Sequence, residues 1–241
     1  MNSWIILPTY NEAANISLLI GEILSVSPQS QVLVVDDNSP DNTAGIVSGM
    51  SGRDPRIHLL LRKGRRGRGS AGIEGFRYAF SAGADYVLEM DADFSHQPRY
   101  IPDLLRAAAE NDAVVACRWM PGGGVRGRPR YRDIVSLSAR FFCRFCLGMR
   151  LNDPTSGFRC FSRKAIAAID WERIISTGPS ILGEMVLLLQ NKGFVFKEIP
   201  VVFMERSRGR SKLSLGKLFA VFYSLTKIKL ALSFNGRSGA V

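Results

Sequence analysis

The chain has 241 residues, and its 24 arginines and 8 lysines outweigh 21 acidic residues to give a formal net charge of +11. Apolar residues make up 46% of the sequence, which is enough for a packed core and excludes a disordered tail or a fibrous protein. The length fits one large or two small domains. The arginine excess indicates an acidic partner, and the candidates are nucleic acid, a phosphorylated ligand and an anionic membrane surface.

Cysteine use and hydropathy predict a cytosolic protein. Cys143 and Cys146 form a C-x-x-C, but no second pair supports a zinc site, so buried reduced thiols in a helix are the favoured interpretation. The N-terminus runs directly into an apolar segment at residues 4–8 without the basic region of a signal peptide. No uncharged apolar stretch reaches the roughly 18–20 residues of a membrane span.

Apolar strand-like segments alternate with helical ones over the first half of the chain, which predicts an open α/β sheet with right-handed crossovers. The expected strands are residues 3–7, 31–36, 57–61, 86–90 and 113–117. The expected helices are residues 11–26, a helix opened by Ser39-Pro40-Asp41, residues 70–82 and a helix near residues 100–110. The Gly/Arg/Pro-rich residues 121–130 are expected to form a long loop.

Residues 214–234 are the nearest approach to a membrane element. They are rich in Leu, Phe, Val and Ile, with Lys217, Lys227 and Lys229 interspersed. Their polar residues fall on two roughly opposite sides of a helical wheel, so two short helices with a bend fit better than one amphipathic helix. A helix packed on the core and a helix lying on a membrane surface are equally good interpretations.

Polar clusters follow three of the predicted strands, at residues 8–12, 36–39 and 91–93. Ligands of such sheets bind at the carboxyl ends of the strands, so the three clusters are expected to form one site. Asp91 and Asp93 lie two residues apart on an extended segment and point the same way, which is unfavourable unless a cation lies between them. Mg²⁺ or Mn²⁺ suits this pair and would bridge a diphosphate, whereas two solvated carboxylates in a turn are the plainer alternative.

Two further patterns have a structural and a functional interpretation. Asp36 fits a capping role, whereas the neighbouring Asp37 can accept hydrogen bonds from a nucleobase. Residues 67–72 match G-x-G-x-x-G, but they follow the third strand and carry arginine, so a nicotinamide dinucleotide is disfavoured. Arginines cluster at residues 62–68, 126–132 and 206–210. One interpretation is that their planar guanidinium groups bind phosphate oxygens, and the other is that these segments are solvated loops.

Four motifs occur in order, at residues 8–12 (PTYNE), 35–41 (VDDNSPD), 90–98 (MDADFSHQP) and 209–213 (GRSKL). With them the chain resembles the polyprenol-phosphate (dolichol-phosphate) mannose synthases, inverting family-2 glycosyltransferases with a GT-A fold. The resemblance covers roughly the whole chain and implies a mostly parallel open sheet with flanking helices and C-terminal amphipathic interface helices. It implies one domain, residues 1–241, with a nucleotide-sugar-binding half (1–120), an acceptor-binding half (121–213) and membrane-interface helices (214–234).

The resemblance also implies roles for individual residues at adjoining subsites. The residues expected to bind the nucleotide sugar GDP-mannose are Pro8, Tyr10, Glu12, Val35, Asp37, Asp91, Ala92, Asp93, Arg118, Arg206 and Lys212. Asp93 is expected to bind a Mg²⁺ or Mn²⁺ ion, with Ser95 beside it. The acceptor phosphate is expected to contact Arg118, Arg132 and Ser136. The residues expected to act in catalysis are Asp91, Asp93, Arg118, Arg132 and Ser136.

The chain departs from the family pattern at several positions. Arg66 and Arg68 stand where the family often has leucine, which makes the loop around them more basic. Several relatives carry glutamine at the position of Ser95, where water can substitute as a metal ligand. Some relatives add transmembrane helices after the catalytic domain. A short form, a membrane-anchoring partner subunit and a truncated chain all fit the end at Val241.

The implied activity is transfer of mannose from GDP-mannose to a polyprenyl phosphate with inversion, at the cytoplasmic face of a membrane. A phosphate monoester has a second pKa of about 6 and is largely dianionic at pH 7, so it attacks without a strong general base. The sequence fits this requirement because it has only two histidines. His58 begins a strand and is expected to be structural, whereas His96 either tunes the metal loop or packs in it.

Two alternatives remain. A polyprenyl-phosphate glycosyltransferase that uses a UDP-sugar such as UDP-glucose has the same fold, although residues 38–41, 96–98 and 211–213 favour the mannose branch. A nucleic-acid-binding module is expected to interleave aromatic residues with its basic loops. Residues 62–69 and 126–130 contain none, so no nucleic-acid partner is expected.

Overall fold

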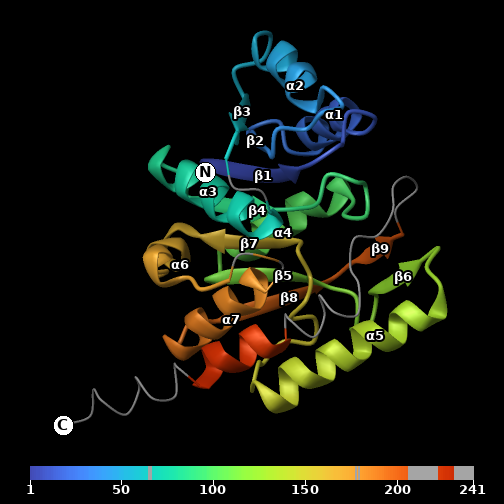
Figure 1. Cartoon of the computed structure of the whole chain (residues 1–241), viewed down its shortest axis with the longest axis vertical. Helices are drawn as coiled ribbons and strands as arrows, with labels where there is room; N and C mark the ends of the chain where they lie inside the picture. Colours follow the sequence, from blue (N-terminus) through green and yellow to red (C-terminus); the bar gives the residue numbers. More distant parts are fainter. Residues whose placement is uncertain (65–66, 177, 179, 206–221, 231–241) are drawn as a thin grey trace.

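The computed structural model describes residues 1–64, 67–176, 178, 180–205 and 222–230. A seven-stranded sheet runs through its centre in the order β3-β2-β1-β4-β7-β5-β8 (Figure 1). Its strands are β1 (Ser3–Thr9), β2 (Gln31–Asp36), β3 (Ile57–Leu61), β4 (Tyr86–Glu89), β5 (Ala113–Cys117), β7 (Arg159–Ser162) and β8 (Phe196–Pro200). A separate parallel pair consists of β6 (Gly124–Arg126) and β9 (Val202–Met204).

The sheet is mostly parallel, as expected, with one reversal. Strands β3, β2, β1 and β4 pair in parallel, as do β5 and β8. In contrast, β7 runs antiparallel between β4 and β5. Because β7 comes from the predicted acceptor-binding half, its insertion joins the two predicted halves in a single sheet.

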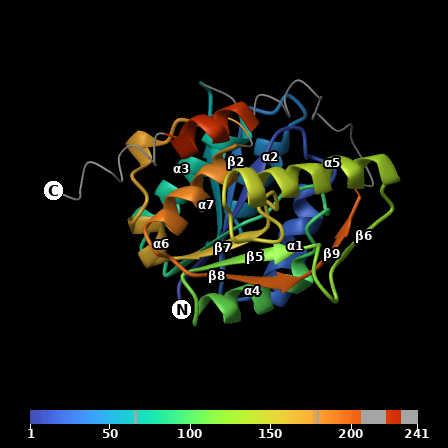
Figure 2. The ribbon, with the colours of Figure 1, turned by 90° about the horizontal axis from the view of Figure 1, so that it is seen from below.

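Helices cover both faces of the sheet, and Figure 2 shows α4 and α7 on opposite sides of β5 and β8. One face packs against α1 (Ile16–Val26), α2 (Thr43–Ser51) and α4 (Ile101–Ala108), and the other against α3 (Arg68–Ser81), α6 (Arg163–Ala167) and α7 (Ile181–Asn191). Successive residues of β2 alternate between the two apolar cores, with Val34 in one and Val35 in the other. Burial on both faces explains why this strand is apolar throughout.

Two segments differ from the sequence expectation because their backbone groups form hydrogen bonds with residues that are distant in the sequence. The helix expected to begin at Asn11 begins instead at Ile16. Hydrogen bonds tie the preceding turn to the loop after β2, since the N–H groups of Asn11, Glu12 and Ala13 donate to Ser39 Oγ (2.9 Å), Thr43 Oγ1 (3.0 Å) and Asp41 Oδ2 (2.9 Å). The loop expected at residues 121–130 contains β6, whose partner β9 lies far along the chain.

The helix α5 (Arg130–Phe141) continues into a π-helical turn at Phe142–Cys146. Cys143 is buried there, and burial raises its pKa to about 11, but Cys146 is exposed, which corrects the expectation that both thiols are buried. The helical residues 222–230 pack Leu225 and Ile228 into a core cluster shared with α7. That portion therefore packs as a core helix does, whereas the bend expected within residues 214–234 lies largely outside the described residues.

Within the described part of the chain, no helix combines the length and apolar character needed to cross a bilayer.

Candidate active site

The loops that follow β1 and β2 are held together by a buried carboxylate. Asp36 has no exposed surface and accepts hydrogen bonds from Thr9 Oγ1 (2.9 Å), Ser39 N (2.8 Å) and Ser39 Oγ (2.6 Å). It thereby stabilises the turn in which Asn38 adopts a left-handed φ of +54°. Asp36 is a structural residue, and its position fixes the next residue, Asp37, at the carboxyl edge of the sheet.

Asp37 is paired with the basic loop that follows β3. Its carboxylate accepts hydrogen bonds from the Arg62 guanidinium and from Gly67 N (2.7 Å). Arg62 is itself buried and also donates to Glu74 (3.0 Å) and Ser70 (2.7 Å). Arg62 is therefore a buried structural residue that links the basic loop to Asp37, and it is not part of a solvated surface. Each carboxylate oxygen of Asp37 has a second lone pair, so the expected contact with a base stays a prediction.

The structure divides the remaining nucleotide-binding candidates into exposed and buried groups. Tyr10 and Glu12 are partly exposed on the loop after β1, and Pro8 is partly exposed beside Val35 in the sheet. The Val35 and Ala92 side chains are buried in the two cores, so the expected contacts of these two residues with a nucleotide would involve their backbone and stay predictions. Arg206 and Lys212 lie outside the described residues.

Asp93 is oriented by the serine two residues beyond it. Its Oδ1 accepts hydrogen bonds from Ser95 N (3.1 Å) and Ser95 Oγ (2.6 Å), and both side chains are buried. Phe94, between them, has a φ of +61°, which turns the chain back on itself. In this geometry Ser95 holds the Asp93 carboxylate in place, and its role as a metal ligand stays a prediction.

The carboxylate oxygens of Asp91 and Asp93 suit a small hard cation that keeps water or phosphate as its other ligands. Among the described residues, no group of three or more His, Cys, Asp and Glu side chains gathers around one point. Two carboxylates on one short loop therefore supply only part of an octahedral shell. Mg²⁺ commonly completes such a shell with water and substrate phosphate, so the two residues suit a cation that arrives with a diphosphate.

An arginine already contacts one of these carboxylates. The Arg68 guanidinium donates to Asp91 Oδ1 through Nε (2.9 Å) and Nη2 (2.7 Å), and its Nη1 lies 3.4 Å from Glu89 Oε1. Burial opposes the charge of Arg68, but the nearby carboxylates more than compensate and raise its pKa. Burial also raises the pKa of Glu89, whose Oε2 has no hydrogen-bond partner within the described structure. Arg68 thus supplies positive charge at the strand ends.

Two glycines create the space for this ion pair. A Cβ on Gly72 would lie 2.7 Å from Glu89 Oε1, and a Cβ on Gly157 would lie 2.6 Å from Arg68 Nη2. The last glycine of the G-x-G-x-x-G pattern is therefore explained by the close approach of α3 to the end of β4.

His96 is a packed, neutral part of the same loop. Its Nδ1 accepts a hydrogen bond from Asp91 N (2.9 Å), and its ring stacks on Phe158 at 5.0 Å. Burial lowers the pKa of His96, which favours the neutral ring. Because Nδ1 is an acceptor, the proton lies on Nε2, 3.9 Å from Asp91 Oδ2. His58, in contrast, bonds to Gln31 (2.9 Å) in the sheet, as a structural residue does.

Arg118 follows β5 and is locked in a bidentate pair. It donates to Asp153 through Nε (2.7 Å) and Nη2 (2.7 Å), and its Nη2 also reaches Thr155 Oγ1 (2.9 Å). The loop that carries both partners is held from inside by the fully buried Arg159, which donates to the carbonyls of residues 154, 156 and 182.

The other two expected acceptor residues lie on α5. Arg132 pairs with Glu205, which follows β9. Ser136 Oγ accepts a hydrogen bond from Arg128 Nη2 (2.7 Å), and Arg128 is close enough to Arg118 and Arg132 for their charges to depress its pKa, after the larger effect of burial. The structure therefore gathers Arg118, Arg128 and Arg132 into one cluster, hereafter the arginine cluster. The role of Arg128 was missed because a basic loop gives no sign of which arginine is buried.

One aromatic ring separates the arginine cluster from the loop that carries Asp91 and Asp93, hereafter the aspartate loop. Phe203, in β9, lies 5.3 Å from the Arg118 guanidinium and 5.4 Å from the His96 ring. The backbone adds a second link, because Met204 N donates to Ser95 O (3.2 Å). The acidic and basic groups predicted from the sequence are thus neighbours, with β9 between them.

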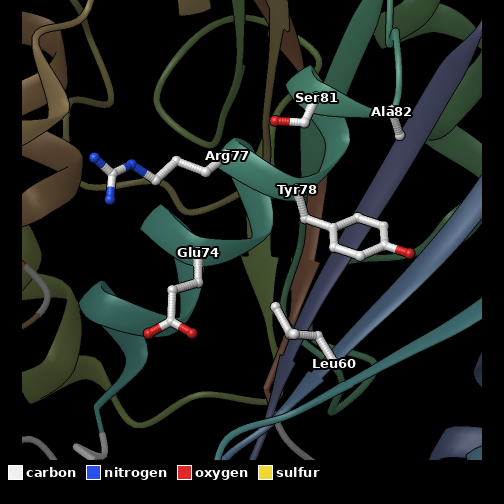
Figure 3. A pocket seen from close by; sticks show the side chains of 6 residues that line it. All are labelled: Leu60, Glu74, Arg77, Tyr78, Ser81 and Ala82. Atoms are coloured by element: carbon white, nitrogen blue, oxygen red, sulfur yellow. The ribbon is translucent and has the colours of Figure 1, made fainter.

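A shallow groove of about 550 Å³ lies elsewhere, along α3 (Figure 3). Its lining residues are Leu60, Glu74, Arg77, Tyr78, Ser81 and Ala82. None of them is among the predicted site residues, and Glu74 serves the structure as a partner of Arg62. The groove is separate from the site at the strand ends.

Comparisons with known proteins agree with this geometry. The family model described as "Glycosyl transferase family 2" matches residues 4–170. The undecaprenyl-phosphate mannosyltransferase of Micrococcus luteus is 37% identical over 231 residues, which are 96% of this chain and 95% of that protein. The polyprenol monophosphomannose synthase of Mycolicibacterium smegmatis is 37% identical over 212 residues, 87% of this chain and 80% of that protein.

Solved structures of similar fold include glucosyl-3-phosphoglycerate synthase from Mycobacterium tuberculosis. Its complex with Mn²⁺, UDP and phosphoglyceric acid matches with a TM-score of 0.67 and 20% identity, over 96% of this chain and 78% of that one. Its complex with Mg²⁺ and UDP gives a TM-score of 0.65 at 20% identity, over 96% and 79%. The fold is therefore that of a GT-A-like glycosyltransferase. The chain belongs to glycosyl transferase family 2, among the polyprenyl-phosphate mannose synthases.

Proposed function

We propose that the chain transfers mannose from GDP-mannose to the phosphate of a polyprenyl phosphate, with inversion at the sugar carbon. The names of its relatives, an undecaprenyl-phosphate mannosyltransferase and a polyprenol monophosphomannose synthase, support the sugar and the lipid class. One structural observation carries the reaction type: an aspartate loop suited to a diphosphate lies one aromatic ring, Phe203, from an arginine cluster suited to a second phosphate.

The donor is expected at the edge formed by β1, β2 and β4. Asp37 would accept hydrogen bonds from the guanine base, and Asp91 and Asp93 would hold a divalent cation beside the diphosphate. Bound there, Mg²⁺ or Mn²⁺ would offset the charge of GDP as it leaves. Arg206 and Lys212 are the expected clamp on the same diphosphate.

The acceptor is its own nucleophile. A dianionic phosphate oxygen forms the new bond to C1 of mannose as the bond from C1 to the GDP oxygen breaks, so no proton has to be removed. Direct displacement turns the α-linked donor into a β-linked product. This chemistry needs positioning and charge, which Arg118, Arg132 and Ser136 would supply. Because Arg118 is already paired with Asp153, it would orient the phosphate without neutralising it completely.

The side of α5 that faces away from the core supports a membrane location. Four large apolar side chains are exposed along α5 and its π-helical extension: Ile134, Leu137, Phe141 and Phe145. Their spacing of three, four and four residues puts them on one face, hereafter the α5 apolar face. We propose that this face lies on the cytoplasmic surface of the membrane, where a polyprenyl phosphate presents its head group to the arginine cluster. Residues 214–234 and an anchoring subunit remain further candidates for membrane attachment.

The choice of nucleotide can be tested by thermal unfolding. GDP with Mn²⁺ is expected to raise the melting temperature clearly more than UDP with Mn²⁺ at the same concentration, because only the native state binds the ligand. At a hundred times its dissociation constant, a ligand adds about 2.7 kcal/mol to the free energy of unfolding. An equal or larger shift with UDP would favour a UDP-sugar donor instead.

Membrane binding can be tested with the double variant Phe141→Ser/Phe145→Ser. Burying a phenylalanine is worth about 1.5–3 kcal/mol, so cosedimentation with anionic phospholipid vesicles is expected to fall by tenfold or more. Leu18→Ser is a matched control, since Leu18 is comparably exposed but lies on α1. Unchanged vesicle binding by the double variant would refute the assignment of the α5 apolar face.

A further inference from the structure

Arg128 is a buried arginine with a donor left over. Only 7% of its side chain is exposed, its Nη2 donates to Ser136 Oγ (2.7 Å), and the same atom lies 3.0 Å from Asp133 Oδ1. Its Nε is buried and has no hydrogen-bond partner within the described structure. Leaving a buried donor unsatisfied is destabilising, and more so when the donor belongs to a charged group. Such exceptions are rare in folded proteins and call for a specific explanation.

The electrostatic surroundings of Arg128 favour an anion at that place. Arg118 and Arg132 both repel its charge. Each of those two residues is compensated by its own close carboxylate, Asp153 or Glu205. The carboxylate nearest to Arg128 is Asp133, at 3.0 Å from its Nη2, and Glu205, which also offsets its charge, is already paired with Arg132. Three guanidinium groups with one buried donor unused form a site that a doubly charged phosphate would stabilise.

We propose that Arg128 is a further binding residue of the acceptor subsite, whose Nε donates to the lipid phosphate while its Nη2 positions the Ser136 hydroxyl. The two contacts use adjacent nitrogens of one planar group, so Arg128 couples the place of the phosphate to the orientation of the serine. The identity of the ligand as a polyprenyl phosphate rests on the proposed function. The existence of a phosphate-binding site at Arg128 does not depend on it.

The planar fork is essential to this role. A lysine at position 128 keeps the positive charge but presents one compact ammonium group in place of two nitrogens held at a fixed distance. It therefore cannot replace both contacts at once. Arg128→Lys is expected to behave like Arg128→Gln in acceptor binding, whereas a role as a general positive charge would let lysine restore most of the affinity.

The test is calorimetric titration with dimethylallyl phosphate, a water-soluble prenyl phosphate, and separately with GDP and Mn²⁺. Arg128→Gln and Arg128→Lys are each expected to weaken prenyl phosphate binding by roughly ten- to a hundredfold, which corresponds to about 1.4–2.8 kcal/mol, and to leave GDP binding unchanged. Arg163→Gln is the control, because Arg163 donates to the carbonyls of Phe80 and Ala84 (both 3.0 Å) at the end of β7 that lies away from the arginine cluster.

The outcomes separate this proposal from the proposed function. Unchanged affinity for dimethylallyl phosphate in both variants would overturn it, as would an equal loss of GDP binding or full rescue by lysine. A structural role alone would lower the melting temperature of the variants without a selective loss of phosphate binding. If the variants lose phosphate binding as expected but the wild-type protein transfers no mannose to a lipid phosphate, the Arg128 site stands and the proposed function fails.

Discussion

The variant Asp93→Asn is expected to lose transfer activity by roughly a hundred- to a thousandfold, the range for removing one electrostatic contact to the transition state. Asparagine has the same shape, and its Oδ1 still accepts the hydrogen bonds from Ser95 N and Ser95 Oγ, so the loop is expected to keep its conformation. What disappears is the negative charge that would hold the divalent cation next to the donor diphosphate.

The measurement combines the turnover rate with a calorimetric titration of Mn²⁺ in the presence of GDP. Both are expected to fall in Asp93→Asn, while the melting temperature changes little. Asp103→Asn is the control, because Asp103 is an exposed residue of α4 that pairs with Arg106 (2.9 Å) on the same helix. Wild-type turnover in Asp93→Asn, or full activity of the native enzyme in chelator, would refute the assignment of Asp93.

The variant Arg159→Met is expected to lower the free energy of unfolding by about 3–5 kcal/mol, because it removes three buried hydrogen bonds donated by a charged group. Arg159 is fully buried, and burial lowers its pKa to about 10, so its charge is held against a substantial desolvation cost. Its three nitrogens satisfy the carbonyls of Pro154, Ser156 and Leu182. The variant would remove the hydrogen bonds that Arg159 donates to these carbonyls and a positive charge near Glu89.

Urea denaturation measures this effect directly. The double variant Glu89→Gln/Arg159→Met is expected to recover part of the lost stability, since it also removes the buried charge of Glu89 that Arg159 helps to offset. A loss below about 1 kcal/mol in the single variant would be typical of a surface ion pair and would contradict the buried role. The loop carrying Asp153 is also expected to loosen, so Arg118 would lose its fixed orientation.

Local patterns predicted most of the central sheet. Strands β2, β3 and β5 have the predicted bounds because each is a short, mostly apolar run. Of these, β2 and β5 are buried on both faces, whereas β3 is a partly exposed edge strand. The convergence of the polar loops after β1, β2 and β4 followed from the same pattern, because parallel strands end at one edge. Asp37, Asp91 and Asp93 were found in this way.

Features that depend on distant contacts could not be predicted. The pairing of β6 with β9 and the antiparallel insertion of β7 join segments that are far apart in the sequence. The same limit applies to arginines, because spacing does not reveal which of them is buried. Arg128 and Arg159 therefore emerged only from the structure, one with an unsatisfied donor and the other with every nitrogen bonded.

The positive charge of the chain is partly internal. Four arginines near the strand ends form ion pairs with acidic partners: Arg62 with Asp37, Arg68 with Asp91, Arg118 with Asp153, and Arg132 with Glu205. Phosphate groups of a bound ligand would either replace the carboxylates in these ion pairs or bind the same arginines alongside them. Such an arrangement suits small phosphorylated ligands at a defined place better than the diffuse backbone of a nucleic acid.

Product analysis tests the central claim most directly. The protein is incubated with GDP-mannose, Mg²⁺ or Mn²⁺ and a short-chain polyprenyl phosphate, and the lipid product is examined by mass spectrometry and by NMR of its anomeric carbon. The account predicts a polyprenyl-phosphate mannose with a β linkage and one GDP released for each product formed. Preferential transfer of glucose from UDP-glucose, or an α-linked product, would contradict it.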